Sequence, residues 1–177
     1  MPMKPRDIIS SVIFYAGVTG VVLLLVRLGT QYGLEKVPQD FTRMQPRIER
    51  GGHLFVNKWA RSPEDLEYGD IIMYRRPLWK RSSVEYEFAR VLGKPGDLVA
   101  LTDKKLYRSG RRAGKLDSEK PQPVAESYLN QRDRPADFSP FIVPRNTVFV
   151  LFDDRHHRER LRDFLVPVRA IHGRVVR

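Results

Sequence analysis

The densest run of side chains able to do chemistry is Asp153–His157, where two carboxylates, one arginine and two histidines follow one another. Carboxylate and imidazole groups are common metal ligands, so the run raises the question of a metal site. Two adjacent histidines on an extended chain point to opposite faces and rarely bind one ion together. The neighbouring Arg155, Arg158 and Arg160 would also repel a divalent cation. We therefore predict no metal and interpret the run as a polar loop held by aspartate–arginine pairs.

The composition of the chain narrows the remaining chemistry. There is no cysteine, which excludes disulfides, thiolate metal sites and a cysteine nucleophile. The 32 basic and 21 acidic residues leave a net charge of +11, a balance that suits nucleic acid, anionic lipid or an acidic protein as a partner. No nucleic-acid-binding motif or basic stripe interleaved with aromatic residues accompanies this charge, so we expect no nucleic-acid partner. We also expect no small-molecule cofactor.

The elements that would position any site begin with an apolar segment, Ile8–Val26, which contains no charged residue. At about 1.5 Å per residue, a helix of this length approaches the hydrocarbon thickness of a bilayer, about 30 Å. A cleavable signal peptide is the alternative, but the run is longer than a usual signal core and no small-x-small cleavage pattern follows it. We predict a cytoplasmic N-terminus and transmembrane anchor over residues 1–28. Lys4 and Arg6 precede the span, which favours a cytoplasmic N-terminus and a domain on the other side.

Beyond the anchor, residues 29–40 are expected to form a linker and residues 41–177 a single domain. Apolar and polar residues alternate there with the period of β-strands. Strands are expected at residues 54–56, 70–74, 84–88 (half-buried), 98–101, 105–107 and 147–152, with hairpin turns at 109–110 and 172–173 and short helices at 63–66 and 159–164. Residues 115–144 are rich in proline and are expected to be an irregular insertion. The predicted class is mainly β: a single N-terminal transmembrane helix followed by an antiparallel β-rich domain.

Several short motifs follow the anchor in a fixed order. They are Met44-Gln-Pro46, Gly69-Asp70, Arg90-Val-Leu-Gly93-Lys-Pro95-Gly96-Asp97, Val148–Asp153 with Asp154 and Arg155, and Ile171–Val175. In this order the motifs resemble those of the type I signal peptidase family, membrane-anchored serine proteases. The resemblance implies a single-pass protein of the bacterial cytoplasmic membrane with a β-rich domain on the outer, periplasmic side. It also implies structural roles for the motif residues Gly69, Asp70, Gly93, Pro95, Gly96, Asp97, Asp153 and Arg155.

The same resemblance exposes the absence of the family's catalytic pair. That family uses a serine nucleophile and a neutral lysine base, a hydroxyl beside an amine whose pKa is lowered by its surroundings. The serine should directly precede Met44, where this chain has Arg43, and the lysine should directly precede Arg90, where it has Ala89. Loss of a nucleophile or base costs several orders of magnitude in rate. We therefore expect no catalytic residue and a degenerate, non-cleaving member, a pseudoenzyme.

A non-cleaving member would act by binding. The resemblance places the peptide groove at Arg43, Met44, Pro46, Arg47 and Arg90. Arg43 and Arg47 could favour an acidic ligand, pair with Glu49 or another carboxylate, or remain solvated. The expected partners are the bilayer and another membrane or exported protein, for which the chain would serve as an assembly subunit, scaffold or chaperone.

Two other functions stay open. The chain could be an active signal peptidase with a rearranged pair, for which Thr42 and Lys94 are the fallback candidates. Against it, Thr42 is one residue from the serine position, and such a shift turns a side chain to the opposite face of an extended chain. Lys94 is five residues beyond the lysine position, in a turn that is expected to be solvated. The last possibility is a basic surface module that binds anionic lipid, with strong salt dependence.

Overall fold

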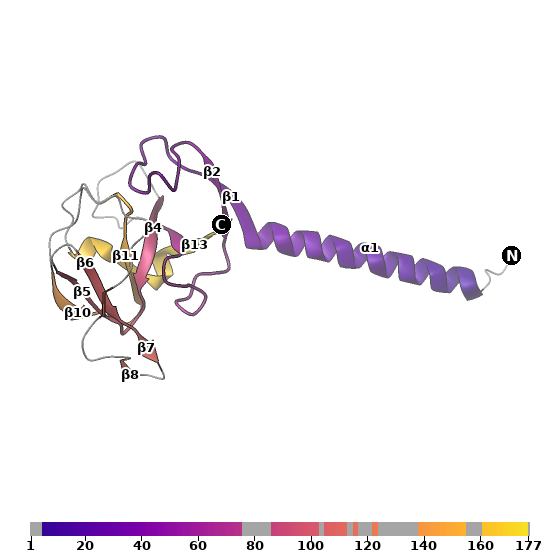
Figure 1. The fold of residues 1–177 in the computed structure, drawn as a ribbon. Helices are drawn as coiled ribbons and strands as arrows, with labels where there is room; N and C mark the ends of the chain where they lie inside the picture. The colour runs from indigo at the N-terminus through magenta and orange to yellow at the C-terminus, as the bar shows by residue number, and fades with distance from the viewer. Residues whose placement is uncertain are drawn as a thin grey trace.

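A computed structural model describes residues 5–75, 86–102, 105–112, 115–116, 122–123, 138–154 and 161–176. One long helix, α1 (Pro5–Gln31), projects from a β-rich domain that contains the remaining elements (Figure 1). Its segment Ser11–Gln31 has a mean hydropathy of 2.1, and none of it is buried against the domain. By length and composition this helix can cross a membrane. The helix continues past Val26 because Arg27–Gln31 contains no proline that would end it.

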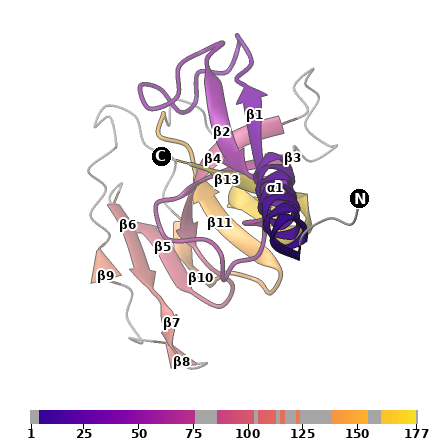
Figure 2. The same ribbon diagram turned by 90° about the vertical axis from the view of Figure 1, so that its right-hand side faces the viewer.

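The domain is built on a seven-stranded sheet with the order β1-β2-β13-β3-β4-β11-β12 (Figure 2). Its strands are β1 (Tyr32–Lys36), β2 (His53–Asn57), β13 (Ile171–Val175), β3 (Ile71–Arg75), β4 (Tyr86–Gly93), β11 (Thr147–Leu151) and β12 (Leu165–Pro167). Every neighbouring pair in this sheet is antiparallel. The predicted antiparallel β class is confirmed.

A second, four-stranded sheet has the order β10-β5-β6-β9. Its strands are β10 (Phe138–Ile142), β5 (Leu98–Thr102), β6 (Lys105–Ser109) and β9 (Gln122–Pro123). The described part also contains a two-stranded ribbon, formed by β7 (Arg111–Arg112) and β8 (Lys115–Leu116). It further contains two 3-10 helices, η1 (Leu161–Phe164) and η2 (Val168–Ala170). The two sheets share one core, since the ring of Phe141 on β10 packs edge-on against Phe149 on β11 with centroids 5.7 Å apart.

The structure differs from the expected linker over residues 29–40. Helix α1 runs to Gln31, and the next residue, Tyr32, already begins β1. All five residues of β1 pair with β2, from Tyr32 opposite Asn57 to Lys36 opposite His53. Sequence pattern alone missed this strand because its stability comes from a partner about twenty residues away and from no strong local alternation.

Strand β4 is not half-buried as expected. Seven of its eight residues, Glu87 to Gly93, are buried, and only Tyr86 is partly exposed. The reason is its place between β3 and β11 in the centre of the sheet, where both faces are covered. A charged residue on such a strand needs a partner inside the protein.

The structure differs from four smaller expectations in the described residues. Residues 172–173 are no turn, because both lie within β13, where the register with β3 shifts between Ile171 and Gly173. A Cβ on residue 173 would lie 2.5 Å from the carbonyl oxygen of Asn57. The glycine at this position is therefore explained by close packing and not by a turn. The strand before residues 109–110 pairs with β5 and β9 and forms no hairpin with β7. Residues 63–66 form turns, and the 115–144 segment contains strands β8, β9 and β10.

Candidate functional site

The loop between β1 and β2, residues 37–52, carries Arg43, which the motif order assigns to the family's nucleophile position. Val37 N donates to Gly52 O over 2.9 Å and closes the base of the loop. Three apolar side chains of the loop, Phe41, Met44 and Ile48, are buried in the core. Burial of these side chains holds the intervening residues in one place, so the position of Arg43 is set by packing on both sides of it.

Contacts with β4 and with the residues after β11 hold Arg43 in place. Its Nη1 lies 3.6 Å from Oε1 of Glu87 on β4, an ion pair that is too long to be a hydrogen bond. Its guanidinium lies 4.8 Å from the ring centroid of Phe152, directly after β11. Its carbonyl oxygen accepts a hydrogen bond of 2.8 Å from Asp154 N. The loop is therefore tied to both β4 and the end of β11 at the nucleophile position.

Glu87 is the acidic side of this pair and is almost completely buried. Its Oε2 accepts a hydrogen bond of 2.9 Å from the hydroxyl of Tyr74, which lies directly opposite on β3. Removing a carboxylate from water is costly unless hydrogen bonds and an opposite charge replace the lost hydration. Tyr74 supplies a hydrogen bond and Arg43 supplies the opposite charge. We call the connected residues Arg43, Tyr74 and Glu87 the Arg43 cluster.

The position of the family's lysine is equally altered. Ala89 is fully buried on β4 and pairs with Ile72 on β3. Alternate residues of a strand point to the same face, so the methyl group of Ala89 lies on the same side of β4 as the carboxylate of Glu87. A methyl group accepts no proton, and a guanidinium carries no hydroxyl that could attack a peptide carbonyl. Neither position can perform the step that the family mechanism assigns to it.

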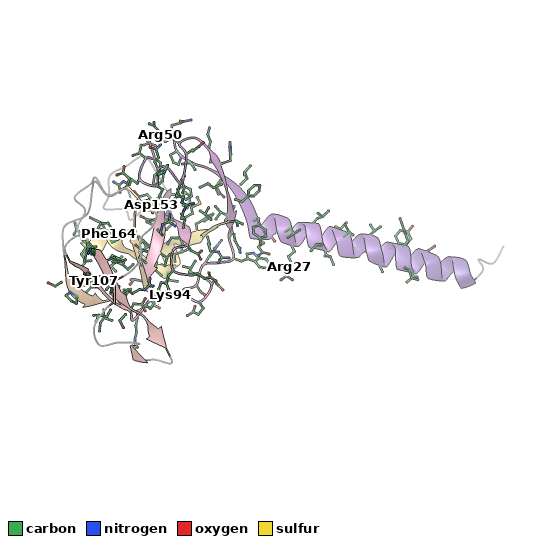
Figure 3. All side chains as sticks on the ribbon, viewed as in Figure 1. Arg27, Arg50, Lys94, Tyr107, Asp153 and Phe164 are labelled. Atoms are coloured by element: carbon green, nitrogen blue, oxygen red, sulfur yellow. The ribbon has the colours of Figure 1, made fainter. Side chains whose placement is uncertain are left out.

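The fallback candidates lie in different surroundings. Thr42 is partly buried in the loop, where its carbonyl oxygen accepts a hydrogen bond of 3.0 Å from Gln45 N. Lys94 follows β4, and its Nζ lies 5.4 Å from the ring centroid of Tyr68. Five residues of strand separate Lys94 from Ala89, about 16 Å at 3.3 Å per residue. Figure 3 shows Lys94 well apart from Asp153, whose neighbour Asp154 bonds to the loop.

The motif residues form a separate structural cluster centred on Arg90. This side chain is buried on β4 and binds buried Asp153 through two nitrogens, with Nε 2.8 Å from Oδ1 and Nη2 on Oδ2. Its Nη1 donates to Gly69 O over 2.8 Å. Planar two-point pairing of this kind fixes geometry as well as charge. Arg90 thereby joins three motifs that are far apart in the chain, and it is buried where no ligand reaches it.

A second motif cluster surrounds the Pro95-Gly96-Asp97 turn. Buried Asp97 accepts hydrogen bonds of 2.7 Å from Lys94 N and 2.9 Å from the hydroxyl of Tyr68. Gly96 has a φ of +88°, a left-handed conformation that glycine adopts without strain. These residues fix the turn between β4 and β5. This structural role explains why a glycine and an aspartate occur here, and it points to no chemical function.

Of the residues expected to line a peptide groove, Met44 and Arg90 are buried and Pro46 and Arg47 are exposed. Arg43 lies between these extremes, with 21% of its side chain exposed. The carboxylate that pairs with it is Glu87 and not Glu49, which is exposed in the same loop. Glu87, Tyr74 and Phe152 were missed by sequence reasoning; the signal that could have found Glu87 is its position two residues before Ala89.

Arg155, His156 and His157 lie outside the described residues. Within the described ranges, no group of three His, Asp or Glu side chains lies close enough together to hold a metal ion.

Comparison with known proteins identifies the class. The family model described as "Signal peptidase, peptidase S26" matches residues 12–176, so the chain belongs to the signal peptidase family. It is 30% identical to "Signal peptidase I T" of Bacillus subtilis over 144 residues, which is 76% of this chain and 67% of that protein. It is 31% identical to "Inactive signal peptidase IA" of Staphylococcus aureus over 141 residues, which is 75% of this chain and 71% of that protein.

Among solved structures, a signal peptidase I from Enterococcus faecalis matches with a TM-score of 0.46 and 21% identity, over 63% of this chain and 97% of that one. The apolar helix α1 and the family together indicate a membrane location.

Proposed function

We propose that this chain is a non-cleaving member of the signal peptidase family that acts by binding another membrane or exported protein. In this proposal α1 anchors it once in the bacterial cytoplasmic membrane, with the N-terminus in the cytoplasm and the β domain on the outer side. The observation that carries the proposal is the Arg43–Glu87 ion pair at the nucleophile position, beside Ala89 at the base position.

Catalysis of peptide cleavage by this family needs a hydroxyl to attack and an amine to take its proton. In this chain Arg43, at the nucleophile position, is a cation that pairs with the buried carboxylate of Glu87. Ala89, at the base position, has no functional group. Removal of either group from a hydrolase lowers the rate by orders of magnitude. A relative whose own name is "Inactive signal peptidase IA" supports the existence of such members.

The charge at this site also favours one kind of ligand. Glu87 already pairs with Arg43, and an acidic ligand would have to compete with this buried carboxylate for the guanidinium. An uncharged polypeptide segment makes no such demand. We therefore expect the bound segment to be apolar or neutral, as exported segments near a membrane often are, and the affinity to change little with salt.

The proposal is tested with the full chain in detergent and a precursor protein that carries a signal peptide. Bacillus subtilis signal peptidase I T, assayed in parallel, shows that the precursor is cleavable. We expect no cleavage product from this chain but measurable binding in fluorescence anisotropy, with the precursor labelled at a single site.

The competing function is an active peptidase that uses Thr42 and Lys94. Cleavage by the wild-type chain that is abolished by Thr42→Ala or Lys94→Ala would overturn our proposal. A rise in salt from 50 to 300 mM shortens the Debye length by roughly one to two halvings. Binding that is lost over this range would instead favour a basic surface that binds anionic lipid or an acidic partner. Purification with native membrane neighbours then identifies the partner.

A further inference from the structure

Strand β1 forms one edge of the seven-stranded sheet, and within the described ranges it has a neighbouring strand, β2, on one side only. Lys58 N donates to Gln31 O over 2.8 Å and Val37 N donates to Gly52 O over 2.9 Å, just outside the two ends of β1. Both pairs continue the register of β1 with β2. Opposite residues of an antiparallel pair alternate between exchanging both hydrogen bonds and exchanging none. The odd-numbered residues of β1 therefore bond to β2.

The even-numbered residues of β1 direct their backbone groups away from the sheet. These residues are Tyr32, Leu34 and Lys36, and each has one N–H and one C=O group at the outer edge. The other side of β2 agrees with this assignment, since Phe55, opposite Leu34, accepts a hydrogen bond of 2.8 Å from Val176 N. A row of such donors and acceptors at an edge is a template for pairing with a strand of another chain.

The direction of α1 relative to this edge suits a second copy of the same chain. Figure 2 looks along α1 and shows β1 and β2 side by side with their broad faces in view, and Figure 1 shows α1 leaving the plane of this hairpin. Two identical antiparallel strands are related by a twofold axis perpendicular to their sheet. At the edge of β1 this axis runs in the general direction of α1. Two copies that pair there insert both anchors into one bilayer in the same direction.

The charges beside the edge favour one alignment of two copies. Glu35 Oε1 lies 2.8 Å from Lys58 Nζ, and a Cβ on residue 33 would lie 2.6 Å from the same nitrogen, so Lys58 occupies the space that Gly33 leaves open. With Leu34 opposite Leu34, Glu35 of each copy lies opposite Gly33 of the other and approaches its Lys58. A shift by two residues places Glu35 opposite Glu35 in one direction, or brings the two lysines together in the other. Like charges directly opposite each other are destabilising.

We propose that β1 pairs antiparallel with β1 of a second copy of this chain, with Leu34 opposite Leu34, and so joins two sheets into one. Tyr32 of each copy then lies opposite Lys36 of the other, and the three opposed pairs exchange about six backbone hydrogen bonds. Gln31 of one copy lies opposite Val37 of the other, so the two anchors begin about 20 Å apart, beyond the roughly 8–10 Å of packed helices. The inference goes beyond the proposed function, because it requires neither a bound peptide nor the Arg43 cluster.

Disulfide cross-linking tests the pairing, since the chain has no cysteine of its own. Leu34→Cys is placed in the full chain, reconstituted in liposomes of phosphatidylethanolamine and phosphatidylglycerol, and oxidised with copper phenanthroline. Its two Cα atoms would lie about 5.5 Å apart, within the reach of a disulfide. Phe55→Cys is the matched control, because Phe55 is 60% exposed against 58% for Leu34, but its two Cα atoms would be three strand spacings apart, about 14 Å. We expect at least fivefold more linked dimer at position 34 than at 55.

A mixture of two variants tests the alignment. Chains with Tyr32→Cys and chains with Lys36→Cys should cross-link with each other when they are reconstituted together, and neither should cross-link with itself. Equal yields at positions 34 and 55 would indicate random collision and overturn the proposal. It would also be overturned by the absence of a dimer at 34, or by cross-linking of Val18→Cys in the middle of α1 without cross-linking at 34, which would assign the association to the helix.

Two further variants at one position test whether backbone hydrogen bonds hold the copies together. In the Leu34→Cys chain, Lys36→Ala and Lys36→Pro both remove the ammonium group, but only the proline removes the N–H group at the outer edge. A proline whose missing N–H faces away from the neighbouring strand is tolerated on an edge strand, and circular dichroism checks that the fold is kept. We expect the proline to lower the dimer yield at least threefold and the alanine to change it by less than twofold. Equal yields from both variants would overturn strand pairing.

Discussion

The Arg43 cluster and the Arg90 cluster each contain an arginine–carboxylate pair with one member on β4, but they are built differently. Arg90 is buried and meets Asp153 through two nitrogens, whereas Arg43 is 21% exposed and lies 3.6 Å from Glu87. The Arg90 cluster keeps the residue types of the family motifs, and the Arg43 cluster stands where the motifs require a serine and a lysine. Contacts that hold this fold together are thus separable from groups that perform its chemistry.

The largest effect is expected from rebuilding the catalytic pair. The triple change Arg43→Ser, Glu87→Gln and Ala89→Lys places a hydroxyl and an amine at the family positions and removes the carboxylate that would hold the amine protonated. We expect cleavage of a signal-peptide precursor at least tenfold above the wild-type background. The matched control carries Arg43→Ser and Glu87→Gln with Ala89 kept, and it should stay inactive. Equal activity of both variants would show that position 89 has no part in it.

The next largest effect is expected at the Arg90 cluster. Arg90→Ala leaves the Asp153 carboxylate buried without its cation, which typically costs about 3–5 kcal/mol of unfolding free energy. Chemical unfolding of the detergent-solubilised chain, followed by circular dichroism, measures this loss. The control is Arg47→Ala, an exposed arginine in the loop, which should stay within about 0.5 kcal/mol of the wild type. A similar small change for both variants would contradict a structural role for Arg90.

A smaller loss is expected at the Arg43 cluster. Arg43→Ala removes the cation that faces Glu87, and a loss of about 1–3 kcal/mol is expected for an under-compensated buried group. Adding Glu87→Gln should recover part of it, because the neutral amide has no charge to compensate. A double-mutant cycle gives the coupling energy, which we expect to exceed about 0.5 kcal/mol. Additive losses would mean that the 3.6 Å pair contributes no stability.

The smallest effect is expected for Tyr74→Phe. It removes one hydrogen bond to the Glu87 carboxylate and keeps the ring, at a cost of about 1–2 kcal/mol. In the Glu87→Gln background the cost should shrink, because a hydrogen bond to a neutral group is weaker. An unchanged cost in that background, measured by the same unfolding assay, would place the hydroxyl of Tyr74 outside the cluster.

The sequence predicted what depends on local pattern and missed what depends on distant partners. The long apolar run of α1 and the short apolar runs of β2 and β11 are local signals, and these elements are confirmed. Strand β1 was expected as a linker because its stability comes from pairing with β2. Glu87 was expected on a half-buried strand because nothing local shows that β4 lies between β3 and β11.

The candidate site shows the same limit. Arg43 and Ala89, which the motif order assigns to the positions of the catalytic pair, were visible from the sequence alone. The cluster around Arg43 was not, since Tyr74, Glu87 and Phe152 approach Arg43 only through the sheet and the end of β11. Residue types at motif positions therefore led to the proposal of a non-cleaving member, and the packing around these positions required the structure.

The place of β13 in the sheet has a consequence for biogenesis. This strand follows all the other described strands in the chain, yet it lies between β2 and β3 and is the only strand that joins them among the described residues. During synthesis, the β1–β2 hairpin is made before β13, the strand that joins it to the rest of the sheet. The core side of the hairpin is therefore covered only after β13 has been made, and among the described strands the last one in the chain completes the sheet.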